Sequence, residues 1–384
     1  MKTIYLDNAA TSYPKPEEVY RAVDNFNRNL GGNPGRGSNQ QTLQAGAIIL
    51  KAREALARLF NINDSLRIAF TLNITEALNT GLKGILKPGD HVVTTSMEHN
   101  SVARPLHVLE QQGIEWTRVP CSPDGSLEPE DVRRALKPNT RLICMLHASN
   151  VTGTIMPIRE IGSIARAYNI LFMVDSAQTA GILPIDVVRD NIDVLTFTGH
   201  KGLMGPQGTG GIYIGPELVI KPLKEGGTGS LSEFLEQPKT MPDLLESGTA
   251  NNPGIAGLLA GIEFIQAVGR ENIRNHETSL TGQLLQGLKE IKGVTVYGPG
   301  DSSVQTAVVA FNIEGIDCGD VCMRLDYEYG IITRSGLHCA PLAHQTMGTL
   351  ELGTCRLSPG YFTTSDEIDQ VLRAIHNIAR QYSG

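Results

Sequence analysis

Short apolar segments rich in β-branched residues recur along the first two-thirds of the chain, and segments with helical spacing lie between several of them. This alternation constrains the fold more than any other feature, because it predicts a mostly parallel sheet covered by helices on both faces. The predicted strands are Arg67–Thr71, Val92–Thr95, Leu142–His147, Leu171–Asp175, Val194–Thr198 and Gly211–Ile214, and the predicted helices are Thr75–Leu86, Ser101–Gln112 and Ile158–Asn169.

The pattern changes after about residue 250. A final helix is predicted there because Thr364 is followed three residues later by Glu367, the spacing of a capping box. The helices predicted in this part are 257–268, 271–291 and 365–382, and the strands are 294–297 and 306–313. We therefore expect an α/β fold in two domains, a large one over residues 16–250 and a smaller α+β one formed by 1–15 and 251–384.

Composition excludes several classes of function. The chain has 384 residues, and 33 basic against 40 acidic side chains give a formal charge of −7. A mildly acidic chain without a block of Lys and Arg argues against nucleic acid or a membrane as partner. Without a signal-peptide pattern or an apolar run of about 18 residues, we expect a cytoplasmic protein. The six cysteines form no C-x-x-C pair, so we expect neither a disulfide framework nor a metal site.

Two polar residues follow neighbouring predicted strands, at the edge of a parallel sheet where ligands bind. Asp175 ends one strand, and alone it would be interpreted as a helix cap or turn carboxylate. Lys201 follows the next strand, and alone it would be a solvated loop residue or a phosphate contact. Together they fit a lysine that forms a Schiff base with an aldehyde cofactor and a carboxylate that keeps the cofactor's pyridinium nitrogen protonated.

Further polar side chains fall at the same predicted strand ends. An isolated His is usually structural, but His99 could stack its ring on a flat heteroaromatic cofactor. Asn150 and Gln178 could hydrogen-bond the phenolic oxygen of such a cofactor. Thr75 opens a helix directly after a strand, where it either only caps the helix or helps to cradle a phosphate. Further phosphate candidates are Thr198 and His200.

The chain resembles the cysteine desulfurase and selenocysteine lyase family, within the class V branch of fold-type I pyridoxal-phosphate (PLP) enzymes. The resemblance covers the chain from end to end, and its pieces occur in family order. The pairing of D-S-A-Q with T-G-H-K is its most specific part. The matching segments are YLDNAATS, TEALN, MEHNS, SNVTG, VDSAQTAG, TGHKGLMGPQGTGGIY, ESGTANNPG and RSGLHCAP.

The resemblance implies PLP as cofactor, bound by the large domain. It implies Lys201 as the Schiff-base lysine, Asp175 as the pyridinium partner and His99 as the stacking ring. It also implies a homodimer, in which Gly227 and Thr228 reach the phosphate of the neighbouring subunit. The remaining implied cofactor contacts are Gln178 and Asn150 near the phenolic oxygen, with Ile74, Thr75, Thr198 and His200 at the phosphate.

Cys339 lies in RSGLHCAP, within the predicted small domain. A free cysteine is usually a buried small hydrophobe. Cys339 differs because its segment is polar and because Arg334 and His338 are close in sequence; cationic neighbours favour the nucleophilic thiolate. The segment also resembles the catalytic-cysteine motif of the group II desulfurases. This resemblance implies that Cys339 is catalytic.

Arg356 follows the cysteine segment, where the family places the arginine that binds the substrate carboxylate. An arginine suits this role because its planar fork donates two parallel hydrogen bonds. Arg334 is the second choice, and Asn150 is also expected near the substrate. The predicted reaction converts free L-cysteine to L-alanine and leaves a persulfide on Cys339, from which a protein acceptor takes the sulfur.

This sequence departs from the family pattern at several positions, and these departures leave the substrate open. Leu337 stands where group II members usually have a second histidine, and Gly35 and Asn39 stand where relatives often have histidines. The phosphate loop reads Asn73-Ile74 where a Gly-Thr pair is usual.

Three other functions therefore stay open. A selenocysteine lyase would share every cofactor residue and could act without Cys339. Another class V aminotransferase or β-lyase would leave RSGLHCAP unexplained. A non-catalytic scaffold is disfavoured because Lys201, Asp175 and His99 are all retained.

Overall fold

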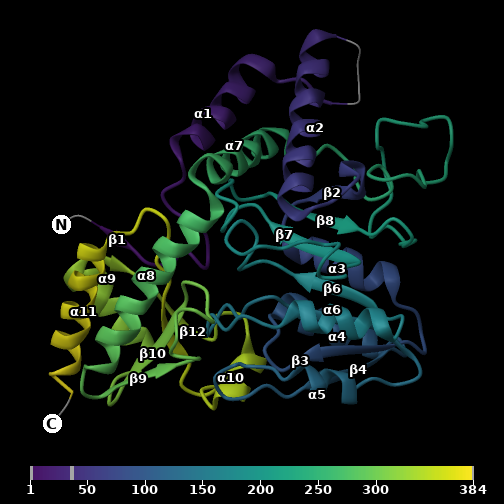
Figure 1. The fold of residues 1–384 in the computed structure, drawn as a ribbon. Helices are drawn as coiled ribbons and strands as arrows, with labels where there is room; N and C mark the ends of the chain where they lie inside the picture. Colours follow the sequence, from purple (N-terminus) through teal and green to yellow (C-terminus); the bar gives the residue numbers. More distant parts are fainter. Residues whose placement is uncertain (1–2, 35–38, 383–384) are drawn as a thin grey trace.

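The computed structural model describes residues 3–34 and 39–382, and its fold is built around a seven-stranded sheet (Figure 1). The strands are β2 (Ile68–Thr71), β3 (His91–Thr95), β4 (Glu115–Val119), β5 (Thr140–Leu146), β6 (Leu171–Asp175), β7 (Val194–Thr198) and β8 (Gly210–Ile214). Their order is β2-β8-β7-β6-β5-β3-β4. Neighbours from β4 to β7 are parallel, and β8 is antiparallel to both β7 and β2. The sheet is therefore mostly parallel, as predicted.

Helices cover both faces of this sheet. They are α2 (Gln40–Phe60), α3 (Ile74–Ile85), α4 (Asn100–Glu110), α5 (Pro129–Arg134) and α6 (Ile158–Ala167). Side chains alternate between the faces along each strand. In β5, Leu142 and Cys144 belong to the apolar cluster with α3 and α4, whereas Ile143 and Met145 belong to the cluster with α2 and α6. Because both faces are buried, the central strands β5 and β6 are continuously apolar over Leu142–Leu146 and Leu171–Val174.

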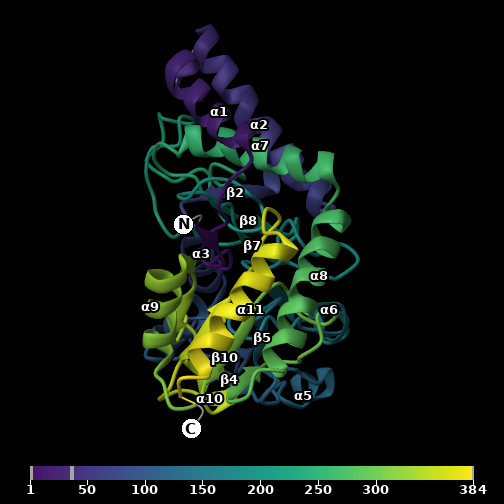
Figure 2. The ribbon, with the colours of Figure 1, turned by 90° about the vertical axis from the view of Figure 1, so that its left-hand side faces the viewer.

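One more layer of helices lies outside α2. Helix α1 (Glu17–Asn25) continues into a π-helical turn over Phe26–Leu30, and both pack against α7 (Asn252–Val268). Helix α7 also packs along α2, and its Ile255, Leu258 and Ile262 join the core of the large sheet. Figure 2 shows α7 leading into α8 (Arg270–Lys289), which descends toward the second part of the molecule.

A second, four-stranded antiparallel sheet has its own apolar core. Its order is β12 (Arg334–Gly336), β13 (Thr354–Leu357), β10 (Val309–Ile313) and β9 (Val294–Tyr297). Helices α8, α9 (Cys318–Tyr329) and α11 (Ser365–Ala379) pack on it, and α10 (Pro341–Met347) follows β12 (Figure 2). Near the N-terminus, β1 (Ile4–Tyr5) pairs in parallel with β11 (Ile331–Ile332). Ile4 and Leu6 thereby join this smaller core.

Most predicted elements lie within a few residues of their observed bounds. The capping box is confirmed, because the Thr364 side chain accepts from the backbone of Glu367 and the Glu367 side chain accepts from the backbone of Thr364. The strand predicted over 306–313 is wrong at its start and begins at Val309. Thr306 instead donates its N–H to the carbonyl of Gly153 at 2.8 Å, which ties this segment to a loop of the large sheet.

Candidate active site

A cavity of about 210 Å³ lies past the carboxyl ends of the parallel strands, and Arg334 of β12 and Arg356 of β13 line its other side. It brings together every predicted site residue except Gly227 and Thr228, which lie in a separate loop. The predicted residues that line it are Ile74, Thr75, His99, Asn150, Asp175, Gln178, Thr198, His200, Lys201, Arg334, Cys339 and Arg356.

Asp175 and Lys201 lie in the middle of the sheet edge that is formed by the carboxyl ends of the parallel strands. Asp175 is the last residue of β6, and its buried Oδ1 accepts the N–H of Ala177 at 2.8 Å. Burial raises the pKa of this carboxyl, partly offset by that hydrogen bond and by Lys201. Burial also lowers the pKa of Lys201 to about 8, and the charge of Arg356 adds to that effect. A lysine with a lowered pKa is poised to react as a neutral amine.

The lowered pKa of Lys201 predicts how the cofactor-free protein takes up PLP. Only the neutral amine is nucleophilic, so the uptake rate should rise with pH up to about 8 and then level off. The growth of visible absorbance after PLP is mixed with the protein over a pH series measures this rate. A rate that keeps rising to the ordinary lysine pKa of 10.5 would contradict it.

His99 presents a neutral ring to the cavity. It is the N-cap of α4, and its Nδ1 accepts the backbone N–H of Ser101 at 3.0 Å. Burial and then the charge of Lys201 lower the pKa of His99 to about 4. A neutral ring held at one nitrogen by the helix start can stack on a flat heteroaromatic group.

The start of α3 lies at the cavity and has the groups that could hold an anion. Asn73 caps the helix by accepting from Glu76 N at 2.9 Å, and the Thr75 hydroxyl lies 2.8 Å from that of Ser101. Ile74 and Thr75, the first residues of this twelve-residue helix, line the cavity, and the free N–H groups at a helix start carry the positive end of the helix dipole. Gly210 permits this arrangement, because a Cβ there would lie 2.9 Å from Asn73 Cα.

The remaining polar side chains are held by the backbone around the cavity. Gln178 Nε2 donates to the carbonyl of Ala9 at 3.1 Å. Asn150 Nδ2 donates to the carbonyl of His338 at 2.7 Å. Thr198 donates to the carbonyl of Thr209 at 3.4 Å, and burial lowers the pKa of His200 to about 4.

Cys339 sits at the tip of a tight turn after β12. The turn runs from Leu337 to Ala340, whose N–H donates to the carbonyl of Leu337 at 2.8 Å. Both central residues have positive φ, 49° at His338 and 58° at Cys339. This left-handed conformation is costly for non-glycine residues, so the surrounding contacts must hold it. One such contact is the N–H of Asn100, which donates to the carbonyl of Cys339 at 2.8 Å.

The predicted role of His338 as a cationic neighbour of Cys339 is wrong. The His338 ring is buried, and its Nε2 lies 3.1 Å from the carbonyl of Thr354. Burial, with the nearby charge of Arg356, lowers the pKa of His338 to about 2, so the ring is neutral. The cationic side chains that share the cavity with Cys339 are Lys201, Arg334 and Arg356.

Arg356 is buried on β13 and is held by two partners. Its Nη2 lies 2.7 Å from Asp7 Oδ1, and its Nη1 donates to the carbonyl of Asn150 at 3.0 Å. Its Nε is buried without a partner. Asp7 was not among the predicted site residues, although it lies inside the segment YLDNAATS. The ion pair fixes the guanidinium, and the partnerless Nε remains for an anionic ligand.

We expect Asp7→Asn to weaken substrate binding without loss of PLP. A charge-assisted hydrogen bond contributes about 1.5–3 kcal/mol, and about 1.4 kcal/mol is tenfold in affinity. KM for the substrate should therefore rise about tenfold, with a smaller change in kcat. Steady-state kinetics and the visible absorbance measure the two effects. Lost absorbance with unchanged KM would show that Asp7 serves the cofactor instead.

The cavity fits a polar, aromatic, phosphorylated cofactor. Several buried polar atoms that line it have no partner in the described structure, and a bound group would satisfy them. They are Asn150 Oδ1, His200 Nδ1, His338 Nδ1 and Arg356 Nε. With a reactive lysine, a carboxylate, a flat neutral ring and a helix start, this donor set matches the chemistry of PLP. No group of three metal-ligating side chains occurs among the described residues.

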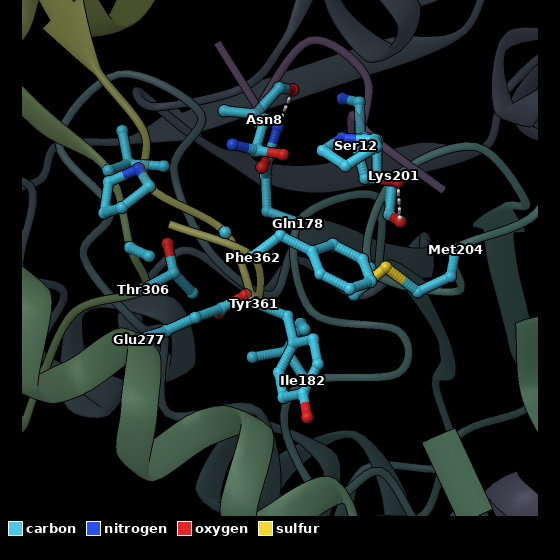
Figure 3. Close-up of a pocket in the computed structure, with 17 residues that line it drawn as sticks. Asn8, Ser12, Gln178, Ile182, Lys201, Met204, Glu277, Thr306, Tyr361 and Phe362 are labelled. Atoms are coloured by element: carbon cyan, nitrogen blue, oxygen red, sulfur yellow. Dashed lines mark hydrogen bonds between the residues drawn. The ribbon is translucent and has the colours of Figure 1, made fainter. Parts of the chain in front are cut away.

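A smaller cavity of about 50 Å³ adjoins the site (Figure 3). It shares Ala9, Gln178 and Lys201 with the main cavity, and Tyr361 and Glu277 line its far side. Burial raises the pKa of Glu277 to about 8. Its volume is about that of one or two water molecules, so an amino acid substrate belongs in the main cavity.

Known proteins resemble this chain over nearly its whole length. The sequence matches the family described as Aminotransferase class-V over residues 4–371. A "Probable cysteine desulfurase" of Methanothermobacter thermautotrophicus is 34% identical, covering 98% of this chain and 94% of the relative. A "Cysteine desulfurase" of Pectobacterium atrosepticum is 32% identical over 98% of this chain and 93% of the relative.

Among solved structures, the apo cysteine desulfurase of Thermococcus onnurineus NA1 superposes with a TM-score of 0.93 at 32% identity, covering 99% of this chain and 95% of that one. The fold and the class-V match, which covers nearly the whole chain, show that this protein is an enzyme of the class-V aminotransferase type. Within that class, the chain belongs to the cysteine desulfurase family.

No described helix is long and apolar enough to cross a membrane.

Of the positions that depart from the family pattern, Gly35 lies outside the described residues. Asn39 is the N-cap of α2, where its side chain accepts from Thr42 N at 2.9 Å. This position therefore has a structural role in the described chain.

Proposed function

We propose that this protein is a PLP-dependent cysteine desulfurase that converts L-cysteine to L-alanine and leaves a persulfide on Cys339. The observation that carries the proposal is the position of Cys339. Of the six cysteines, all of which the structure describes, it alone is exposed, and it lines the same cavity as Lys201 and Asp175. When bound, PLP supplies the electron sink that stabilises negative charge at the substrate's α-carbon.

Each residue of the site has a distinct task in this reaction. Arg356 binds the substrate carboxylate, and Lys201 takes and returns the proton at the α-carbon. With PLP bound, Asp175 would hold the proton on the ring nitrogen, and His99 would stack on the ring. The Cys339 thiolate attacks the substrate sulfur, forming an S–S bond while the C–S bond breaks. The electrons of that C–S bond stay with carbon, which takes up a proton to give alanine.

The test is to incubate the PLP-loaded protein separately with cysteine and with selenocysteine. Alanine, sulfide and selenide are then measured. Alanine from cysteine, with one persulfide per protein before any acceptor is added, supports the proposal. Turnover of selenocysteine alone would establish the lyase alternative, and pyruvate or transamination products would establish the other class V activities.

We also propose a homodimer in which the segment around Gly227 and Thr228 completes the neighbour's phosphate site. This segment projects from the body beside β8 (Figure 1) and exposes the apolar side chains of Leu231, Phe234 and Leu235. Exposed apolar side chains grouped in one segment favour a subunit interface. We also propose a cytoplasmic location. We further propose two domains, a large one over residues 16–250 and a small one formed by 1–15 and 251–384. Because α7 packs on α2 of the large domain, the boundary near residue 250 is better placed slightly later, after α7.

Replacing the apolar side chains of the projecting segment should separate the subunits. We expect Phe234→Asp with Leu235→Asp to convert a dimer to a monomer and to lower PLP affinity at least tenfold, because the phosphate would lose the partner's contribution. Light scattering and PLP titration measure the two effects. A wild-type monomer that binds PLP and is active would refute the dimer.

A further inference from the structure

Glu98 is a buried acidic side chain that has no task in the proposed reaction. It precedes His99 in the turn between β3 and α4, and it is fully buried. Its Oε1 accepts the hydroxyl of Thr95 at 2.6 Å and the N–H of Leu146 at 3.3 Å. Thr95 ends β3 and Leu146 ends the neighbouring β5, so one carboxyl oxygen joins the carboxyl ends of two paired strands.

The two residues that Glu98 joins lie beside groups of the candidate active site. Leu146 pairs with Asp175 in the register of β5 and β6, and it lines the active-site cavity. The Thr95 hydroxyl also accepts a backbone N–H of the turn that leads to His99. Glu98 therefore links the turn that carries the His99 ring to the strand beside Asp175.

The surroundings of Glu98 favour its protonated, neutral form. None of the ion pairs of the described residues includes Glu98, and an isolated carboxylate is costly to bury. Burial raises the pKa of Glu98 to about 8, against the hydrogen bond from Thr95 and with the negative charge of Asp175. Since Oε1 accepts both hydrogen bonds, the proton belongs on Oε2, which is buried without a partner in the described structure.

The groups around Glu98 place the negative charge of this edge on Asp175. The described titratable groups that interact with Glu98 are Asp175 on β6, Cys144 on β5 and Cys121 after β4. Burial raises the pKa of both thiols, so they stay neutral. Two neighbouring buried carboxyls do not both ionise readily. Asp175 has a backbone N–H and the charge of Lys201 to stabilise its ionised form.

We infer that Glu98 is a positioning residue of the PLP site that acts as a neutral acid. Its carboxyl holds the turn that carries His99 against the strand beside Asp175, and its neutrality leaves the negative charge on Asp175, where the ring nitrogen would bind. The inference rests on the proposed function, because His99 and Asp175 would both act on bound PLP.

Infrared spectroscopy of the purified protein tests the neutral state of Glu98. Measured well below pH 8, the difference between wild type and Glu98→Gln should show the loss of the C=O stretching band of a protonated carboxyl. Measured well above pH 8, the same difference should show the loss of a carboxylate band instead, because the acid has then lost its proton. Loss of a carboxylate band at the lower pH would overturn the inference.

Titration with PLP and the visible circular dichroism of bound PLP test the positioning. Glu98→Gln keeps both hydrogen bonds and the neutral state, so its PLP affinity should stay within about twofold of wild type. Glu98→Leu leaves the Thr95 hydroxyl and the Leu146 N–H unpaired, so PLP affinity should fall about tenfold and the dichroism should change. Wild-type affinity and dichroism in the Leu variant, or an equal loss in the Gln variant, would contradict the positioning role.

Glu277→Leu is the matched control. Burial also raises the pKa of Glu277 to about 8, but this residue lies on α8 and touches neither β3 nor β5 through a described hydrogen bond. Its replacement removes another buried acid and should leave the dichroism of bound PLP unchanged. The same change in dichroism in this variant would show that loss of any buried acid disturbs the site, which overturns a specific role of Glu98.

A second variant covers the case in which Glu98→Leu does not fold. Thr95→Val removes one of the two hydrogen bonds and should lower PLP affinity about threefold; unchanged affinity would overturn the positioning role. Wild-type protein that shows no visible absorbance with PLP would refute the proposed function instead. The infrared difference between wild type and Glu98→Gln does not depend on PLP and still decides whether Glu98 is neutral.

Discussion

Replacing Lys201 with alanine should abolish turnover and remove the visible absorbance of lysine-bound PLP. Lys201 is the amine at the strand edge beside the buried Asp175, and burial lowers its pKa to about 8. The variant loses both the covalent attachment of PLP and the base that moves the α-proton. General acid–base catalysis contributes about 10²–10⁴-fold, so we expect a fall of about 10⁴-fold in kcat.

Lys15 provides a matched control for this variant. Burial lowers its pKa to about 8 as well, but its Nζ donates to the Ser12 hydroxyl and to the carbonyl of His200, and it does not line the site cavity. Lys15→Met should keep the absorbance, with at most a severalfold change in rate. An absorbance that survives in Lys201→Ala and disappears in Lys15→Met would show that the wrong lysine was assigned.

Much of the site could be predicted because strand ends in a parallel sheet converge. Asp175, Lys201 and Asn150 each follow a strand that is recognisable as a short apolar run, and parallel order brings those ends to one edge. The antiparallel direction of β8 was not predictable in this way. An apolar run has the same sequence pattern in either direction, so direction depends on the connection and on packing.

The remaining features depend on contacts between distant parts of the chain. Asp7 and Arg356 pair across 349 residues, a contact that no local pattern encodes. The neutrality of His338 was also missed, because sequence proximity to Cys339 suggests a cation whereas the fold buries the ring against Thr354. Burial, and therefore the protonation of a histidine, is a property of the tertiary structure.

Cys339→Ala should abolish desulfuration of cysteine by at least about a thousandfold while PLP stays bound, because removal of a covalent nucleophile leaves no group that can take its place. The exposed thiol in the active-site cavity is the only one that the described structure presents to the substrate. Alanine formation and the visible absorbance measure the two outcomes. Cys121→Ala is the control, since burial raises the pKa of Cys121 to about 11 and keeps it a thiol.

The same variant separates the two chalcogen substrates. A C–Se bond is weaker than a C–S bond, so selenium can leave without attack by a thiolate, and turnover of selenocysteine should fall much less than turnover of cysteine. A variant that still desulfurates cysteine near the wild-type rate would make Cys339 structural. If activity on both substrates falls equally and the absorbance is retained, Cys339 also attacks selenium. If activity on both falls equally and the absorbance is lost, the turn from Leu337 to Ala340 also shapes the PLP site.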